Sequence, residues 1–259
     1  MFHLKKIKLC NIMATLIVVT ASCLPLSASA ETLLDSTIAD ARTLAFFKVS
    51  DAAVKEWLPD THEIRAFGGP YKGANILMMF IDRMLHQDAE GKSKAGGAYR
   101  MMAVVVPGKN IETGKKATFI SRVYAPSEGV GTYKVSVPAI VSHSLALSGT
   151  GAEPLSGRHD WNISHEGGEI AIGFDYTGAV PKRKTSESIL STPADAGVAR
   201  IYRYDQLTDV LFSPAKGIDR TSNVTVKVSI PELAKMFDGT ATLIGLSDRP
   251  FYTRTTYKP

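Results

Sequence analysis

Short apolar runs separated by turn-forming residues dominate the chain after Pro59, and they restrict the fold more than any other feature. Each run is about five to eight residues long, and Gly, Pro, Asn or Asp residues stand between the runs. Many runs alternate apolar with polar residues or are rich in β-branched residues, which is typical of strands. They cover residues 74–81, 99–106, 116–124, 133–141, 144–147, 169–176, 198–204, 223–230 and 240–246.

So many strands with so few helices predict a mainly β fold. Sheet edges have to be closed or covered, so we expect an antiparallel β-barrel or cone with a few short peripheral helices. The chain has 259 residues, of which 44% are hydrophobic and 21% charged, and this composition excludes intrinsic disorder. With no internal repeat and no long linker, residues 31–259 are predicted to form a single domain.

A few segments fit helices or loops better than strands. Ser50 followed by an amphipathic stretch predicts a short helix that Pro59 ends. We also expect a helix over 35–47, a late helix over 231–237, a helical turn over 204–210 and an exposed loop over 178–197.

The amino terminus has the three parts of an export signal. Residues 1–8 are basic, residues 12–24 are apolar, and Ala28-Ser29-Ala30 is a small-residue cleavage pattern. We therefore predict a signal peptide over residues 1–30 and a periplasmic or secreted protein with no stable membrane insertion after cleavage. A lipoprotein anchored at Cys23 is the less favoured alternative, because Thr20 stands where that signal needs a large aliphatic residue.

Cleavage at Ala30 changes both the cysteine count and the charge. Cys10 and Cys23 both lie in the signal, so the exported chain has no thiol for disulfides, nucleophilic catalysis or zinc binding. Removing three lysines with the signal leaves 27 basic against 25 acidic residues, a net charge of +2. This balance argues against a nucleic-acid partner.

Motifs of several enzyme classes are missing. The sequence has no Gly-x-Ser-x-Gly elbow, no Walker loop and no dinucleotide-binding Gly-x-Gly-x-x-Gly between a strand and a helix. His159 and His165 lie six residues apart, which matches no standard zinc pattern. We predict no metal and no cofactor.

A glycine-rich segment before Lys134 is the most informative local pattern. Gly129 and Gly131 precede this lysine, which opens the apolar run 133–141, and we expect that run to be a central buried strand. A lysine carried toward the sheet interior would lose solvation, which lowers its pKa, and the neutral amine can attack a carbonyl carbon. The alternative is a solvated lysine that points outward from a strand.

The order of these features resembles the acetoacetate decarboxylase superfamily over roughly residues 50–250. The resemblance rests on Trp57-Leu58-Pro59 at the end of an early helix, a strand that reaches Phe80-Ile81-Asp82, and Gly97-Ala98-Tyr99 opening a strand that ends at Val104-Val105-Val106-Pro107. A Glu-x-x-Gly-x-x-Lys stretch follows, matched by Glu128, Gly131 and Lys134, with Ala139 after it.

The resemblance implies a β-cone with a small-molecule site inside it. Lys134 would form a Schiff base with a keto acid, and Glu128 would orient the site or carry a proton. Arg100 would receive a carboxylate, and Tyr99 and Tyr133 would contact the substrate. No cofactor is implied, since the protonated imine itself withdraws electrons.

Two residues depart from the family's decarboxylases, and an export signal is also unexpected for them. Val135 stands where a second lysine usually follows the reactive one, which removes a like charge that would depress the pKa of Lys134. Arg100 and Met101 follow Tyr99, where the decarboxylases place a glutamate two residues after this tyrosine. These departures leave the fold inference intact and put the specific reaction in doubt.

Two small-molecule functions remain open at this point, besides a structural envelope protein whose cone is filled by side chains. The first is an exported acetoacetate decarboxylase-like protein that binds a small keto acid or carbonyl compound, with a decarboxylase or lyase reaction through Lys134. The second is a non-catalytic periplasmic protein that holds an apolar small ligand in the cone. An ammonium group of Lys134 that reaches solvent or pairs with a carboxylate would favour the second. The sequence also leaves a homo-oligomer open.

Overall fold

The protein is represented by a computed structural model that describes residues 33–94, 97–131 and 133–258. The predicted signal peptide, its cleavage site and both cysteines lie outside these residues. Within the described part of the chain, no helix is both long and apolar enough to cross a membrane.

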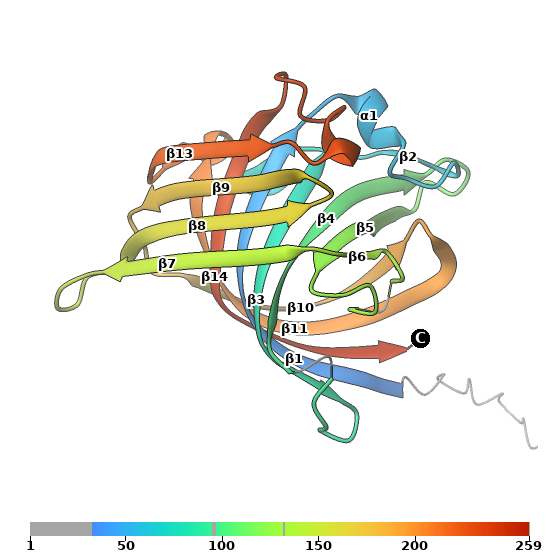
Figure 1. Ribbon diagram of the computed structural model, residues 1–259, viewed down its shortest axis with the longest axis horizontal. Helices are drawn as coiled ribbons and strands as arrows, with labels where there is room; N and C mark the ends of the chain where they lie inside the picture. The colour runs from blue at the N-terminus through green and yellow to red at the C-terminus, as the bar shows by residue number, and fades with distance from the viewer. Residues whose placement is uncertain (1–32, 95–96, 132, 259) are drawn as a thin grey trace, which may run out of the picture. The chain divides into compact units, whose positions relative to one another are not determined.

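The larger of two sheets closes on itself (Figure 1). Its strands follow the order β4-β3-β1-β14-β11-β10-β5, and β5 pairs again with β4. The joint between β10 and β5 is a single parallel pair, Ser191 with Phe119. The strands are β1 (Leu33–Lys48), β3 (Ile76–Asp88), β4 (Tyr99–Asn110), β5 (Lys116–Ala125), β10 (Lys182–Thr192), β11 (Asp195–Ser213) and β14 (Thr242–Lys258). Three shorter strands, β2 (His62–Ile64), β6 (Ser136–Pro138) and β12 (Ile218–Asp219), extend this sheet.

The predicted mainly β cone is therefore confirmed, with one correction to its topology. Most neighbouring strands are antiparallel, but β5 pairs in parallel with both β10 and β6.

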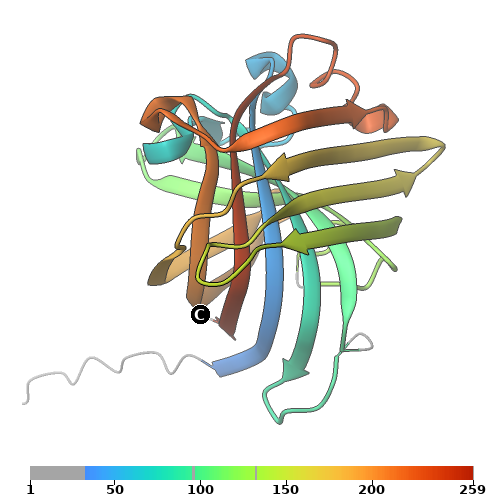
Figure 2. The same ribbon diagram turned by 90° about the vertical axis from the view of Figure 1, so that its left-hand side faces the viewer.

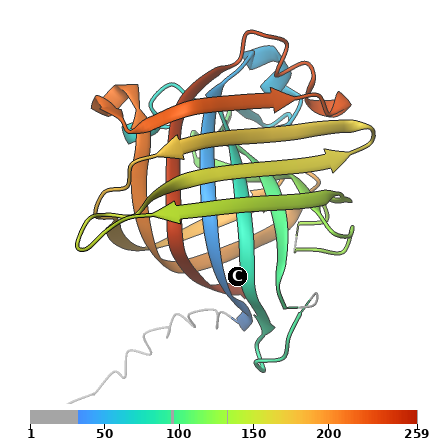
Figure 3. The ribbon, with the colours of Figure 1, turned by 60° about the vertical axis from the view of Figure 1, so that its left-hand side comes forward.

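A second sheet covers part of the outer face of the ring. It contains β7 (Ile140–Ser148), β8 (Ser156–His165), β9 (Gly168–Tyr176) and β13 (Thr221–Val228), in the order β13-β9-β8-β7. Figures 2 and 3 show its strands crossing in front of β1, β3 and β14 at a steep angle. Trp161 on β8 ties the sheets together, because its indole Nε1 donates a hydrogen bond of 3.1 Å to Thr43 Oγ1 on β1.

The alternation of side chains along the strands separates two apolar cores. On β1, Leu44 and Phe46 belong to the core inside the ring, whereas Ala45 and Phe47 belong to the core between the sheets. The same strand therefore supplies both cores, and a residue's odd or even position decides which one it enters.

Helices are few and short, as predicted. The helix expected over 50–57 is α1 (Asp51–Lys55), and the late helix expected over 231–237 is the single turn η3 (Pro231–Leu233). Two further turns are η1 (Gly69–Tyr71) and η2 (Pro214–Lys216).

Three local predictions were wrong. The expected helix over 35–47 is the strand β1, which pairs with β3 on one side and β14 on the other. The expected turn over 204–210 lies inside β11, and the expected loop over 178–197 holds β10 and its hairpin with β11. Pairing with distant strands overrode a weak local preference over 35–47 and 204–210, whereas a local hairpin forms the strand within 178–197.

The segment 133–141 was also predicted wrongly. Instead of a central buried strand it contains β6, a three-residue strand at the end of the large sheet, and the start of β7. Lys134 has a φ of 56°, which is not a strand conformation, so regular pairing starts only after it.

Candidate functional site

Lys134 lies at the protein surface. Its side chain is 75% exposed, and its Nζ is 3.7 Å from Asp195 Oδ2. Its neighbours Tyr133 and Val135 are buried instead. The predicted desolvated environment of Lys134 is therefore wrong, because its ammonium reaches solvent and has a carboxylate beside it.

Glu128 and Arg100 also lie away from the cone interior. The Glu128 side chain is exposed. Arg100 is half-exposed, and its Nε is 2.6 Å from Asp82 Oδ1. Because Met101 belongs to the core inside the ring, Arg100, one position before it on β4, faces the other way.

The two predicted tyrosines are closer to the interior. Tyr133 is buried and lines the cone cavity, where its hydroxyl donates a 2.6 Å hydrogen bond to Tyr202. Tyr99 is half-buried and accepts a 2.7 Å hydrogen bond from Arg83 Nη1. Its hydroxyl also lies 3.1 Å from His86 Nδ1. Of the five predicted site residues, only Tyr133 lines this cavity.

The cavity inside the ring of strands has a volume of about 360 Å³. Aliphatic side chains from β1, β3, β4 and β5 form one part of its wall, and tyrosines and arginines from β1, β3, β11 and β14 form another. The aliphatic part includes Leu44, Leu77, Met79, Ile81, Met101, Val105, Ile120 and Val123. The polar part includes Arg42, Arg83, Arg249, Arg254, Tyr202, Tyr204 and Tyr252.

Two of the arginines share one buried carboxylate. Asp40 is fully buried, and its Oδ2 lies 2.6 Å from Arg42 Nη2, while its Oδ1 lies 2.9 Å from Arg83 Nε. Burial alone would raise the pKa of Asp40, but the two guanidinium groups more than offset this and hold the pKa below its ordinary value.

The other two arginines have no such partner. Among the described residues, neither Arg249 nor Arg254 forms an ion pair with a carboxylate, and the Nε atom of each is buried without a hydrogen-bond acceptor. Arg254 lies over the ring of Tyr202, 3.8 Å from its centroid. Burial, followed by repulsion from Arg42, lowers the pKa of Arg249.

From the sequence, none of the four arginines was identified as a lining residue, although the residue pattern around Arg42 indicated its position. Arg42 and Leu44 are two positions apart and therefore share a face in any strand, so a strand assignment for 35–47 would have placed Arg42 beside core residues. No comparable local signal marks Arg249 and Arg254.

The lining of the cavity restricts its chemistry. Among its described lining residues there is no lysine, aspartate or glutamate. It therefore presents cationic and phenolic hydrogen-bond donors next to an aliphatic wall, without an amine that could form an imine.

Comparisons with known proteins bear on this fold. No family model matches the chain, and no curated protein matches it in sequence. Among solved structures it is similar to the enduracididine biosynthesis enzyme MppR complexed with pyruvate, with a TM-score of 0.54 and 12% identity over 94% of this chain and 96% of that one.

A second similar structure is an acetoacetate decarboxylase-like enzyme from Sphingomonas wittichii RW1. The TM-score is again 0.54, with 8% identity over 87% of this chain and 91% of that one. The protein therefore has the fold of the acetoacetate decarboxylase-like superfamily.

Proposed function

We propose that this is an exported protein that binds a small organic carboxylate with an apolar body, non-covalently, inside the cone. The observation that carries the proposal is the pair Arg249 and Arg254, two half-buried arginines whose buried Nε atoms have no acceptor, in a cavity whose described lining has no carboxylate.

The charge of the cavity supports an anionic ligand. Asp40 balances one of the four arginines, which leaves an excess of about three positive charges around a small volume. An unpaired buried charge is costly, and a carboxylate that accepts hydrogen bonds from guanidinium groups would offset that cost.

The rest of the wall supports a ligand with an apolar body. The side chains that β4 and β5 contribute to the lining include Met101, Val105, Ile120 and Val123, which offer an apolar surface to a ligand. At about 30 Å³ for a water-sized group, 360 Å³ holds about a dozen non-hydrogen atoms. A short-chain or monocyclic carboxylic acid meets both requirements.

The position of Lys134 supports non-covalent binding over a Schiff base. Its amine is exposed beside Asp195 and is absent from the cavity lining. Of the two functions open from the sequence, this favours the non-catalytic one, with the ligand changed from purely apolar to anionic and apolar. MppR, which shares the fold, has been solved with pyruvate, and pyruvate is itself a small carboxylate.

The proposal can be tested by calorimetric titration of the purified protein with hexanoate and with hexanol, which has the same chain without the charge. We expect hexanoate to bind at least tenfold more tightly. Arg249→Met and Arg254→Met should each remove most of this preference, whereas Arg183→Met, at an exposed arginine paired with Asp205, should leave it unchanged. Equal affinity for the two probes, or hexanoate binding that survives both cavity variants, would overturn the proposal.

A further inference from the structure

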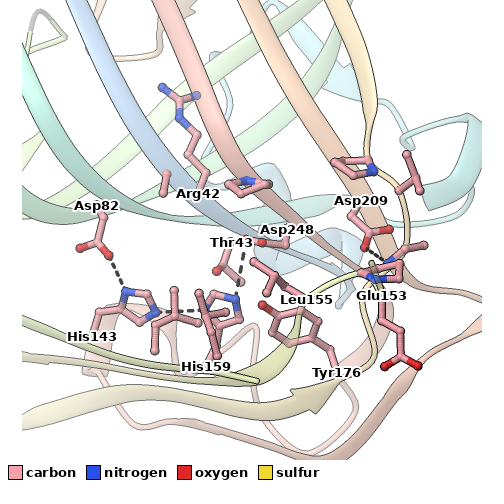
Figure 4. Close-up of a pocket in the computed structure, with 18 of the residues that line it drawn as sticks. Arg42, Thr43, Asp82, His143, Glu153, Leu155, His159, Tyr176, Asp209 and Asp248 are labelled. Atoms are coloured by element: carbon pink, nitrogen blue, oxygen red, sulfur yellow. Dashed lines mark hydrogen bonds and ion pairs between the residues drawn. The ribbon is translucent and has the colours of Figure 1, made fainter. Parts of the chain in front are cut away.

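A second cavity lies on the other face of the large sheet, between it and the small sheet. Its volume is about 460 Å³, and Figure 4 shows part of its lining. Its floor is formed by Asp82, His143, His159, Trp161 and Asp248. Neither the proposed carboxylate site nor the predicted site residues account for this cavity.

A chain of hydrogen bonds runs across the floor from one sheet to the other. His143 Nδ1 on β7 lies 2.5 Å from Asp82 Oδ2 on β3, and His143 Nε2 lies 2.9 Å from His159 Nδ1 on β8. His159 Nε2 then faces Asp248 Oδ1 on β14 at 3.7 Å, which is too long for a hydrogen bond. Figure 4 shows the four side chains in this order.

The order of donors and acceptors leaves one unused lone pair. Partial burial would raise the pKa of Asp82, but His143 and Arg100 hold it below its ordinary value, so Asp82 is an acceptor. His143 Nδ1 lies against the Asp82 acceptor, and in the tautomer in which His143 Nε2 accepts from His159 Nδ1 the remaining lone pair is on His159 Nε2. His159 Nε2 is then an acceptor, and it is buried without any partner.

Rigid packing holds this acceptor in place. The His159 side chain is only 4% exposed and stacks on Tyr176, with ring centroids 5.3 Å apart. His143 stacks on Trp161 at 3.7 Å, and Trp161 is fixed by its hydrogen bond to Thr43. Burial and the neighbouring His143 lower the pKa of His159 to about 3, so its ring stays neutral.

Charge at the floor favours a cation over an anion. The lining has four acidic residues, Asp82, Glu153, Asp209 and Asp248, and one arginine, Arg42. Arg42 is held by Asp40 on the cone side, and Figure 4 shows it directed away from the histidines. Asp82 and Asp209 are paired with Arg100 and Arg220, whereas Asp248 has His159 as its nearest ionic neighbour.

The rim of the cavity is apolar and exposed. It comes from the hairpin between β7 and β8 and from the segment after β9, and consists of Leu145, Leu147, Leu155 and Val180. The two segments touch at Gly178, where an added Cβ would lie 1.9 Å from the Leu155 carbonyl oxygen. Only glycine permits this approach, so the contact between the two rim segments depends on the residue at position 178.

We propose that this inter-sheet cavity is a second ligand site, which takes a small primary amine with an apolar body. The ammonium nitrogen would donate to His159 Nε2 and to the Asp248 carboxylate. Two acceptors 3.7 Å apart can both lie about 2.9 Å from one nitrogen. The apolar body would lie against the rim, and the faces of Tyr176 and Trp161 add to the attraction for a cation.

An alcohol fits this arrangement less well. A hydroxyl has one O–H and no charge, so it can serve only one of the two acceptors, whereas an ammonium group serves both. A carboxylate would meet the acidic floor without a donor. The two cavities of the protein would thus select ligands of opposite charge on opposite faces of one sheet.

The test is a calorimetric titration of the full protein with hexylamine and with hexanol at pH 8, where Asp248 is ionised. Excess hexanoate is present in both titrations to occupy the cone. We expect hexylamine to bind at least tenfold more tightly than hexanol. His159→Phe, which keeps the ring but removes Nε2, and Asp248→Asn should each weaken hexylamine at least tenfold. His165→Phe and Asp160→Asn, on the same strand β8 but outside the cavity, should not.

Two further variants keep the proposal falsifiable and separate it from the carboxylate site. Leu155→Ser changes only an exposed rim residue and should also weaken hexylamine binding. This variant tests the site even when a His159 variant does not fold. Arg254→Met should leave hexylamine binding unchanged. Hexanol binding as tightly as hexylamine, or hexylamine binding that responds to Arg254→Met but not to Asp248→Asn, would overturn the proposal.

Discussion

Arg249 and Arg254 line the same cavity although they are five positions apart along β14. In a regular strand an odd separation would place them on opposite faces. Between Asp40 and Arg42 on β1, however, the paired residues on β14 advance from Tyr252 to Arg249, and β11 shows the matching shift. β14 thus contains one extra residue, a bulge, that turns both guanidinium groups inward.

Replacement of Arg249 should stabilise the free protein. Its guanidinium is buried without a carboxylate partner, so we expect Arg249→Met to raise the free energy of unfolding by about 1–4 kcal/mol. Chemical denaturation with and without hexanoate measures this. The same concentration of hexanoate should stabilise the wild type more than the variant, which binds it more weakly. A destabilised Arg249→Met protein would show that the guanidinium has a partner we have not assigned.

Asp40 should contribute far more to the free energy of unfolding than an exposed aspartate. Asp40→Asn leaves Arg42 and Arg83 without their carboxylate and should lower the free energy of unfolding at pH 7 by about 3–5 kcal/mol. Because the folded pKa of Asp40 lies below 3.8, its contribution is present above that pH and is lost as the pH falls through the folded pKa. The difference between wild type and variant should therefore shrink only in strong acid. Asp160→Asn, at an exposed pair with Arg158, serves as the control and should cost less than about 1 kcal/mol.

Lys134 should be dispensable for folding and for carbonyl trapping. We expect Lys134→Met to change the free energy of unfolding by less than about 0.5 kcal/mol, since the side chain is exposed. Wild-type protein incubated with pyruvate and borohydride should show no adduct at Lys134 by peptide mapping. An adduct at Lys134 that Lys134→Arg abolishes would restore the Schiff-base hypothesis.

Asp248 should make the protein less stable as pH rises. Burial, with a contribution from Asp209, raises the pKa of Asp248 to about 7. The folded state therefore holds this proton more tightly than the unfolded state, and stability falls between pH 3.8 and about 7. Asp248→Asn cannot ionise and should be more stable than wild type at pH 8 by up to about 4 kcal/mol, with little difference at pH 4. Thermal unfolding across this pH range measures it, and an equal effect at both pH values would contradict the assigned burial.

Much of the β architecture could be predicted from residue pattern. The runs 74–81, 99–106, 116–124 and 169–176 correspond to β3, β4, β5 and β9, because each alternates or is β-branched over enough residues to favour a strand without help. The motif-based resemblance also indicated the correct superfamily fold. It did not predict the surroundings of the motif, since Glu128 and Lys134 share the spacing of the family motif but lie at the surface.

Residue pattern alone predicted the mainly β fold class and fixed which residues are available for chemistry. Only the tertiary structure decided which of them meet. Asp82, His143, His159 and Asp248 come from four strands, and they lie in one row of side chains only because the small sheet crosses the large one. Arg249 joins Arg254 only because of a bulge that register with β1 and β11 imposes. Local pattern carries no information about such register, since it arises from pairing between segments far apart in the chain.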